Sequence, residues 1–127
     1  MSYKVLVVDD SKLARMAVNK ALKSLYPDWT LLEAANADEA IASIKSAAPD
    51  IALLDFNMPG RDGLDLAAEL HQSNPRMPVA VISANRQQEI LNRAHAAGAG
   101  FLAKPLTEAA LGEFLKAAGQ SLGKALP

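Results

Sequence analysis

Three apolar segments of the chain end on side chains that could bind a cation or a phosphoryl group. V-L-V-V stops at Asp9 and Asp10, I-A-L-L stops at Asp55, and V-A-V-I stops at Ser83. Two adjacent carboxylates repel each other unless a cation lies between them, and carboxylate oxygens suit a hard cation such as Mg²⁺. A carboxylate can also attack phosphorus and form an acyl phosphate where nearby groups neutralise the charge. These endings therefore indicate a metal site beside a candidate nucleophile.

The elements that position these residues alternate along the chain between short apolar strands and amphipathic helices. This alternation favours right-handed crossovers and a parallel sheet. Ligands of such sheets bind outside the carboxyl ends of the strands, so the three endings should meet in one crevice. Ser11, Asn36 with Glu39, and Thr107 are predicted to cap helices. The five predicted strands are residues 5–8, 29–33, 51–55, 79–83 and 100–103.

Composition and charge restrict the class of protein. The chain has 127 residues, half of them hydrophobic, which is enough to bury one core. Its 13 basic and 14 acidic residues are scattered along the chain, which argues against a DNA-binding surface. It has no cysteine, so disulfide and thiolate chemistry are excluded. The first residues lack signal-peptide character and no apolar run reaches membrane-spanning length, so we expect a cytoplasmic protein without membrane contact.

A set of polar residues recurs at the strand ends in a fixed order: Asp9–Asp10, Asp55, Ser83–Ala84 and Lys104–Pro105. This set resembles the receiver domain of two-component response regulators, and most closely the single-domain, CheY-like chemotaxis type. The likeness covers residues 4 to about 115. It implies an α/β fold, flavodoxin-like and doubly wound, with a five-stranded parallel sheet in the strand order 2-1-3-4-5.

The resemblance also implies a phosphorylation-activated signalling switch. Asp55 would accept a phosphoryl group from the phospho-histidine of a sensor histidine kinase or of a histidine phosphotransfer protein. Asp9, Asp10 and Asp55, together with the backbone carbonyl of Asn57, would bind Mg²⁺. Such a domain catalyses its own phosphorylation and dephosphorylation, and no turnover of an external substrate is expected.

Other residues have supporting roles in the same resemblance. Lys104 and Ser83 would contact the phosphoryl oxygens. The Lys104–Pro105 peptide bond is expected to be cis. Phe101 occupies the position of the family's switch aromatic, although its place in a strand also allows a static core residue. The positions expected to adjust access to the acyl phosphate and its lifetime are Ala84, Asn57 and Asn85.

Alternatives to an active receiver remain open from the residues alone. Taken singly, each acid, the serine and the lysine would be a helix cap, a turn residue or a solvated side chain. A flavodoxin-like FMN carrier shares the fold, although Asp9 and Asp10 would repel a phosphate that lacks a metal. A haloacid-dehalogenase-type phosphatase would carry its nucleophile on the first strand. A degenerate receiver would act only as a protein-interaction module, but normally lacks an acid or the lysine.

We expect one receiver domain over residues 1–127, with a core at about 4–118 and a frayed tail at 119–127. It would be a stand-alone regulator or an excised receiver, and a monomer or a weak, phosphorylation-dependent dimer. Without direct contact to nucleic acid, its output would be binding of a downstream protein through the fourth helix, the fifth strand and the fifth helix.

Overall fold

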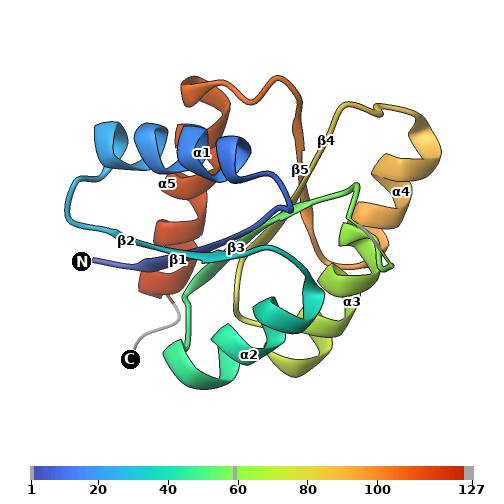
Figure 1. The fold of residues 1–127 in the computed structure, drawn as a ribbon, viewed down its shortest axis with the longest axis horizontal. Coiled ribbons are helices and arrows are strands. Elements are labelled where there is room, and N and C mark those ends of the chain that lie inside the picture. The colour runs from blue at the N-terminus through green and yellow to red at the C-terminus, as the bar shows by residue number, and fades with distance from the viewer. Residues whose placement is uncertain (1, 59, 125–127) are drawn as a thin grey trace.

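The computed structural model describes residues 2–58 and 60–124 of the chain. Five strands alternate with five helices along this part, and none of these helices is long and apolar enough to cross a membrane. The strands are β1 (Lys4–Val8), β2 (Thr30–Ala34), β3 (Ile51–Asp55), β4 (Val79–Ser83) and β5 (Gly100–Ala103). The helices are α1 (Lys12–Leu25), α2 (Ala37–Ala47), α3 (Gly63–Ser73), α4 (Gln88–Ala96) and α5 (Glu108–Lys124) (Figure 1).

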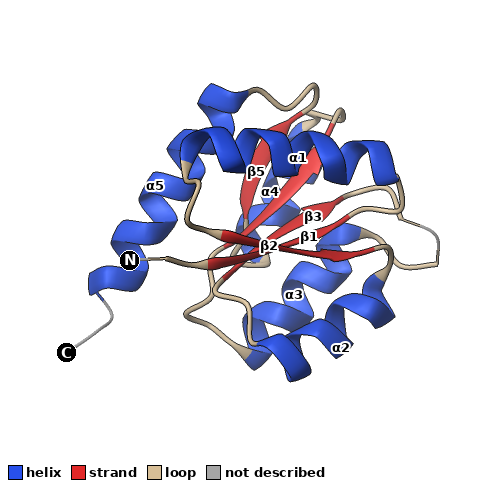
Figure 2. Ribbon diagram, turned by 60° about the vertical axis from the view of Figure 1, so that its left-hand side comes forward, coloured by secondary structure: helices blue, strands red, loops and turns tan. Residues whose placement is uncertain are grey.

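The five strands form one parallel sheet in the order β2-β1-β3-β4-β5, which confirms the predicted topology. Figure 2 shows α1 and α5 on one face of the sheet and α2 and α3 on the other. α4 packs into the same hydrophobic cluster as α2 and α3. The sheet is therefore covered on both faces, as expected for a doubly wound α/β fold.

Side chains of the central strands alternate between two apolar cores. Leu6 and Val8 of β1 pack with α2, α3 and α4, whereas Val5 and Val7 pack with α1 and α5. β3 and β4 are buried along their whole length. Because successive side chains of a strand point to opposite faces, a strand covered on both sides needs an unbroken apolar run. This explains the apolar segments of the sequence.

Three polar side chains interrupt this apolar interior. Among the residues that the structure describes, the buried polar or charged ones are Asp9, Asp55 and Ser83, at 7%, 4% and 1% exposure. Burying a charge costs free energy unless partners compensate for the lost water. All three residues lie at or directly after the carboxyl ends of β1, β3 and β4, at the edge where parallel sheets bind ligands. Their burial points to a site at this edge.

Side-chain caps begin the helices where the sequence predicts them. Ser11 and Thr107 each accept a hydrogen bond from the backbone N–H three residues later, at 3.2 and 3.0 Å. Asn36 accepts from the Glu39 N–H at 2.9 Å, and the Glu39 carboxylate accepts in return from the Ala35 N–H at 3.0 Å. The Ser11 cap starts α1 at once after the two acids, which keeps the connection between β1 and α1 short.

Three elements have other bounds than the sequence predicts, and the first of them, β1, begins one residue earlier, at Lys4. β2 is shifted by one residue towards the carboxyl terminus, because the Trp29 N–H donates to the Tyr26 carbonyl at 3.0 Å in the turn before the strand. α5 continues to Lys124, so residues 119–124 are helical instead of frayed. Gly119 lies against Tyr3 and Trp29, and the Tyr3 hydroxyl donates to the Gly119 carbonyl at 3.5 Å. These contacts stabilise the additional turn, and residues 125–127 lie outside the described part of the chain.

Candidate functional site

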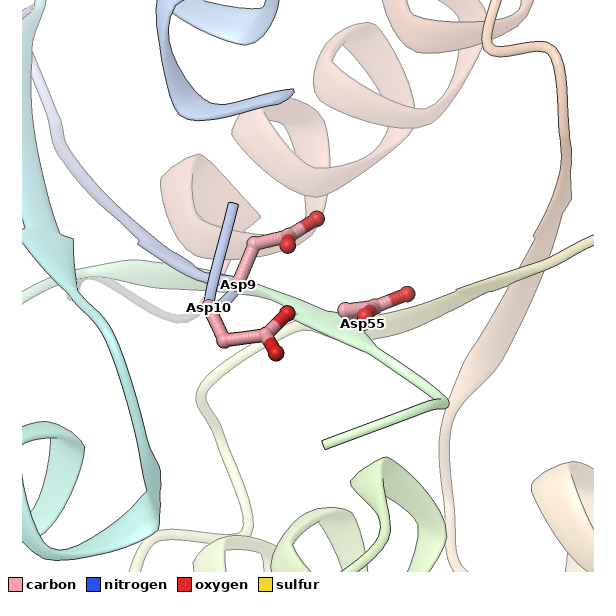
Figure 3. A group of neighbouring side chains, drawn as sticks. All are labelled: Asp9, Asp10 and Asp55. Atoms are coloured by element: carbon pink, nitrogen blue, oxygen red, sulfur yellow. The ribbon is translucent and has the colours of Figure 1, made fainter. Parts of the chain in front are cut away.

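Three carboxylates meet at the carboxyl ends of β1 and β3. The two strands are neighbours, so the residues that follow Val8 and Leu54 emerge side by side. One carboxylate oxygen from each of Asp9, Asp10 and Asp55 lies within 4.8 Å of the other two, and Figure 3 shows the three side chains together at these strand ends. Asp9 and Asp55 are buried, whereas Asp10 is exposed. The structure thus brings together the three acids that the sequence singles out.

The Asp55 carboxylate has a cationic partner from another strand. Lys104, directly after β5, donates from Nζ to Oδ1 of Asp55 at 2.7 Å. Since β4 lies between β3 and β5, the lysine side chain reaches past the end of β4. A buried carboxylate without such a partner would carry an uncompensated charge. The ion pair therefore connects the candidate nucleophile at the end of β3 to the residue that follows β5.

Ser83 lies at the end of the strand between Asp55 and Lys104. Its backbone oxygen accepts from the Lys104 N–H at 3.0 Å, which fixes the lysine backbone beside it. Its hydroxyl oxygen accepts from the Asn85 N–H at 3.0 Å. Because a hydroxyl both accepts and donates, the Ser83 O–H can still donate a hydrogen bond to another oxygen in the site. Ser83 is thus held by its own loop while keeping a donor for a ligand.

Burial raises the pKa of the Asp9 carboxyl group above its usual value. The neighbouring carboxylates of Asp55 and Asp10 act in the same direction, whereas a hydrogen bond from the Ser11 N–H at 2.8 Å and the charge of Lys104 oppose it. The raising effects are larger, so the protein groups around Asp9 do not fully compensate its negative charge. A further positive charge would therefore stabilise the acidic cluster.

The donor set fits a hard divalent cation. Three carboxylates offer oxygen atoms at mutual distances that one ion can bridge, and one lysine among the described residues is paired with the cluster. Mg²⁺ prefers oxygen ligands and is bound by one or a few carboxylates together with water and phosphate oxygens. Asp9, Asp10 and Asp55 are the residues that would hold it. The contribution of the Asn57 backbone carbonyl stays a prediction.

The remaining residues singled out by the sequence lie around this centre. The Lys104–Pro105 peptide bond is cis, as predicted. Phe101 is partly buried and packs against the cluster that includes α4. Ala84, Asn85 and Asn57 are exposed in the loops that follow β4 and β3. Their positions agree with the expected layout, and their individual roles stay predictions.

Two residues beside the site were missed by the sequence reasoning. A Cβ atom at Gly63, the first residue of α3, would come within 2.3 Å of the Asp55 backbone oxygen, so only glycine allows this approach. Arg15 donates from its guanidinium group to the Asp9 backbone oxygen and from Nε to Glu33 at 3.0 Å. Its place one turn after the Ser11 cap was the only available signal, and helix position alone does not reveal which carbonyl a long side chain reaches.

The model of the response regulator receiver domain matches residues 5–116 of this chain. The chain therefore belongs to the response regulator receiver domain family. It is 40% identical over 119 residues to the positive alginate biosynthesis regulatory protein of Pseudomonas aeruginosa, with 91% of this chain and 47% of that protein covered. It is 36% identical over 104 residues to the nitrate/nitrite response regulator protein NarL of Escherichia coli, with 80% and 48% covered.

The fold matches solved structures of the same family. The chemotaxis protein CheY4 of Vibrio cholerae superposes with a TM-score of 0.84 at 27% sequence identity, covering 93% of this chain and 99% of CheY4. The chain spans about half the length of the two curated relatives, so it corresponds to one part of those proteins.

The comparisons do not favour a flavin carrier, and every acid and the lysine expected of an active receiver is in place.

The ion pair of the site makes a testable contribution to stability. Breaking one side of a buried pair costs about 3–5 kcal/mol, but the Lys104 side chain is 38% exposed, so we expect Lys104→Met to lower the free energy of unfolding by only about 1–2 kcal/mol. Urea denaturation at pH 7 without Mg²⁺ measures this loss. In an Asp55→Asn background the same substitution should cost much less, since the charge to be compensated is gone. Equal costs in both backgrounds would show that the pair contributes nothing.

Proposed function

We propose that this receiver domain accepts a phosphoryl group on Asp55 from the phospho-histidine of a sensor histidine kinase or of a histidine phosphotransfer protein. The observation that carries the proposal is the setting of Asp55. It is buried, bonded to Lys104 at 2.7 Å, and within 4.8 Å of the Asp9 and Asp10 carboxylates. A nucleophile with positive charge on one side and a cation-binding pair of acids on the other suits phosphoryl transfer.

The transfer itself needs one attacking oxygen and one leaving nitrogen. An oxygen of the Asp55 carboxylate bonds to phosphorus while the P–N bond of the phospho-histidine breaks, and the imidazole leaves with the bonding electrons. The product is an acyl phosphate. Lys104 can move from the carboxylate to the new phosphoryl oxygens, and the Ser83 hydroxyl can donate a hydrogen bond to one of them. Bound Mg²⁺ supplies positive charge that offsets the charge of the transferring group.

The test is uptake of a phosphoryl group by the purified chain. Incubated with acetyl phosphate and Mg²⁺, the protein should gain one phosphoryl group per molecule by intact mass spectrometry. Excess chelator should prevent the gain, because three carboxylates would then face the phosphoryl donor with one lysine to balance them. No uptake from acetyl phosphate or from phosphorylated histidine phosphotransfer proteins would overturn the proposal. The domain would then act through protein contacts alone.

Phosphorylation is further proposed to alter the surface formed by α4, β5 and α5, where a downstream protein would bind. A phosphoryl group on Asp55 offers Ser83 a new acceptor, so it stabilises a conformer in which the loop after β4 moves inward. Phe101 lies partly buried beside α4 and could then turn fully into the core. The cytoplasmic location and a monomeric or weakly dimeric state stay predictions.

The phosphate mimic beryllium fluoride provides a direct test of this switch. Its binding should shift the Phe101 ring resonances and the backbone amides of residues 84–104 in NMR spectra. The same addition to the Ser83→Ala variant should give smaller shifts at Phe101, since the donor that pulls the loop inward is missing. If the shifts stay within the loops that touch Asp55 while the Phe101 ring is unchanged, the domain signals by another route.

A further inference from the structure

Arg15 connects the first helix to the ends of two strands. Its guanidinium group donates to the backbone oxygen of Asp9, and its Nε donates to the carboxylate of Glu33 at 3.0 Å. The Arg15 side chain is only 15% exposed, although it carries a permanent charge. Asp9 follows β1 and Glu33 belongs to β2, so one planar group bridges α1, β1 and β2. This arrangement uses two of the donors that distinguish arginine from lysine.

The backbone oxygen that Arg15 binds belongs to the peptide group between the two metal-binding acids. Asp9 is fixed further by its N–H, which donates to Ala34 at 3.0 Å, and by its carboxylate, which accepts from Ser11 at 2.8 Å. The carboxylate of Asp10 has no hydrogen bond or ion pair within residues 2–58 and 60–124. The direction of the Asp10 side chain (Figure 3) therefore depends on the backbone that Arg15 holds.

We propose that Arg15 is a positioning residue for Mg²⁺ binding, a role that rests on the proposed function of the site. By holding the Asp9–Asp10 peptide, it keeps two mutually repelling carboxylates close enough to share one cation. Glu33 compensates the guanidinium charge, so that Arg15 does not repel the incoming Mg²⁺. Groups that orient metal ligands without touching the metal commonly change metal affinity by 10- to 100-fold when replaced.

The direction in which Mg²⁺ affinity changes when Arg15 is replaced distinguishes a positioning role from a simple charge effect. If Arg15 acted only as a nearby positive charge, its removal would strengthen Mg²⁺ binding, because like charges repel. If it positions the acids, its removal weakens binding. We expect Arg15→Met to raise the Mg²⁺ dissociation constant of the full chain by about tenfold in isothermal titration calorimetry. At saturating Mg²⁺, the rate of phosphorylation by acetyl phosphate should fall far less, since the acids are then held by the cation.

Lys23 offers a matched control on the same helix. It also carries one positive charge and donates to a backbone oxygen, that of Trp29 at 2.8 Å, near the other end of α1. Lys23→Met should leave the Mg²⁺ dissociation constant within about twofold of the parent value. Arg15→Lys retains the charge but not the planar pair of donors, so it should restore part of the affinity.

Each result decides the inference. An unchanged or lower dissociation constant in Arg15→Met overturns the positioning role while leaving the proposed function intact. If the parent protein binds no Mg²⁺, the proposed function and this inference both fail. If Arg15→Met does not fold, as judged by circular dichroism, the Arg15→Lys variant decides: weaker Mg²⁺ binding than in the parent supports positioning, and parent affinity overturns it.

Discussion

Asp55→Asn should abolish phosphorylation of this receiver domain. In the proposed transfer the Asp55 carboxylate oxygen is the attacking atom, and an amide in its place is not nucleophilic, so the loss should be complete. In a hydrolase triad, removal of the nucleophile costs on the order of 10⁶-fold in rate. After incubation with acetyl phosphate and Mg²⁺, intact mass spectrometry should show one phosphoryl group on the parent and none on the variant.

Asp50 provides the matched control for this substitution. It precedes β3 at the opposite edge of the sheet, where its Oδ2 accepts from the Lys4 N–H at 2.8 Å. Asp50→Asn removes the same charge from the residue directly before the same strand, without touching the site, and phosphorylation should stay within about twofold of the parent. Robust labelling of the Asp55→Asn variant at some other residue would end the assignment of Asp55 as the sole acceptor.

Much of the fold could be predicted from the sequence because its signals are local. Apolar runs of four residues mark strands covered on both faces, and Ser11, Asn36 and Thr107 mark helix starts through bonds to N–H groups three residues away. The strand order came from the resemblance, not from these patterns. Convergence of Asp9 and Asp55 follows once the order is known, since β1 and β3 are then neighbours.

What the sequence could not reveal depends on contacts between distant residues. Asp9 and Asp10 are identical in type and adjacent, yet Asp9 is buried, which raises its pKa, whereas Asp10 is exposed. That difference arises from the direction in which each side chain leaves the end of β1. Arg15 reaches Glu33 across 18 residues of sequence, and no periodicity encodes this pairing. The helical turn at Gly119 likewise depends on rings supplied by residues near the start of the chain.

Replacing both Asp9 and Asp10 with Asn should have opposite effects on phosphorylation and on stability. Phosphorylation in Mg²⁺ should fall by about 10²- to 10³-fold, the typical cost of removing a group that stabilises charge in the transition state. Without Mg²⁺, the free energy of unfolding at pH 7 should rise instead, because a desolvated and repelled charge is removed from the site. Phosphorylation of the double variant at the parent rate, or of the parent in excess chelator, would contradict the magnesium role.

The size of the stability gain follows from the spacing of the acids. The carboxylate oxygens lie at most 4.8 Å apart, and at that distance two unit charges repel by about 0.9 kcal/mol in water and by about 3.5 kcal/mol at an effective dielectric constant of 20. Lys104 offsets part of this repulsion at Asp55. We therefore expect a gain near the lower limit, about 1 kcal/mol, in urea denaturation with chelator present.

The stability gain should also depend on pH with a defined sign. Burial, with a smaller effect from Asp55 and Asp10, raises the pKa of Asp9 in the folded protein. A group of this kind makes its full contribution to the free energy of unfolding below its pKa in the unfolded chain, roughly 3.9. That contribution is lost as pH rises through its higher pKa in the folded protein. An Asp9→Asn variant has no such group, so its advantage over the parent should be smallest at acid pH and should grow to a plateau above the folded pKa. Urea denaturation of both proteins in chelator measures this difference across the pH range. An advantage that does not change with pH would mean that the charge of Asp9 carries no cost in the folded site.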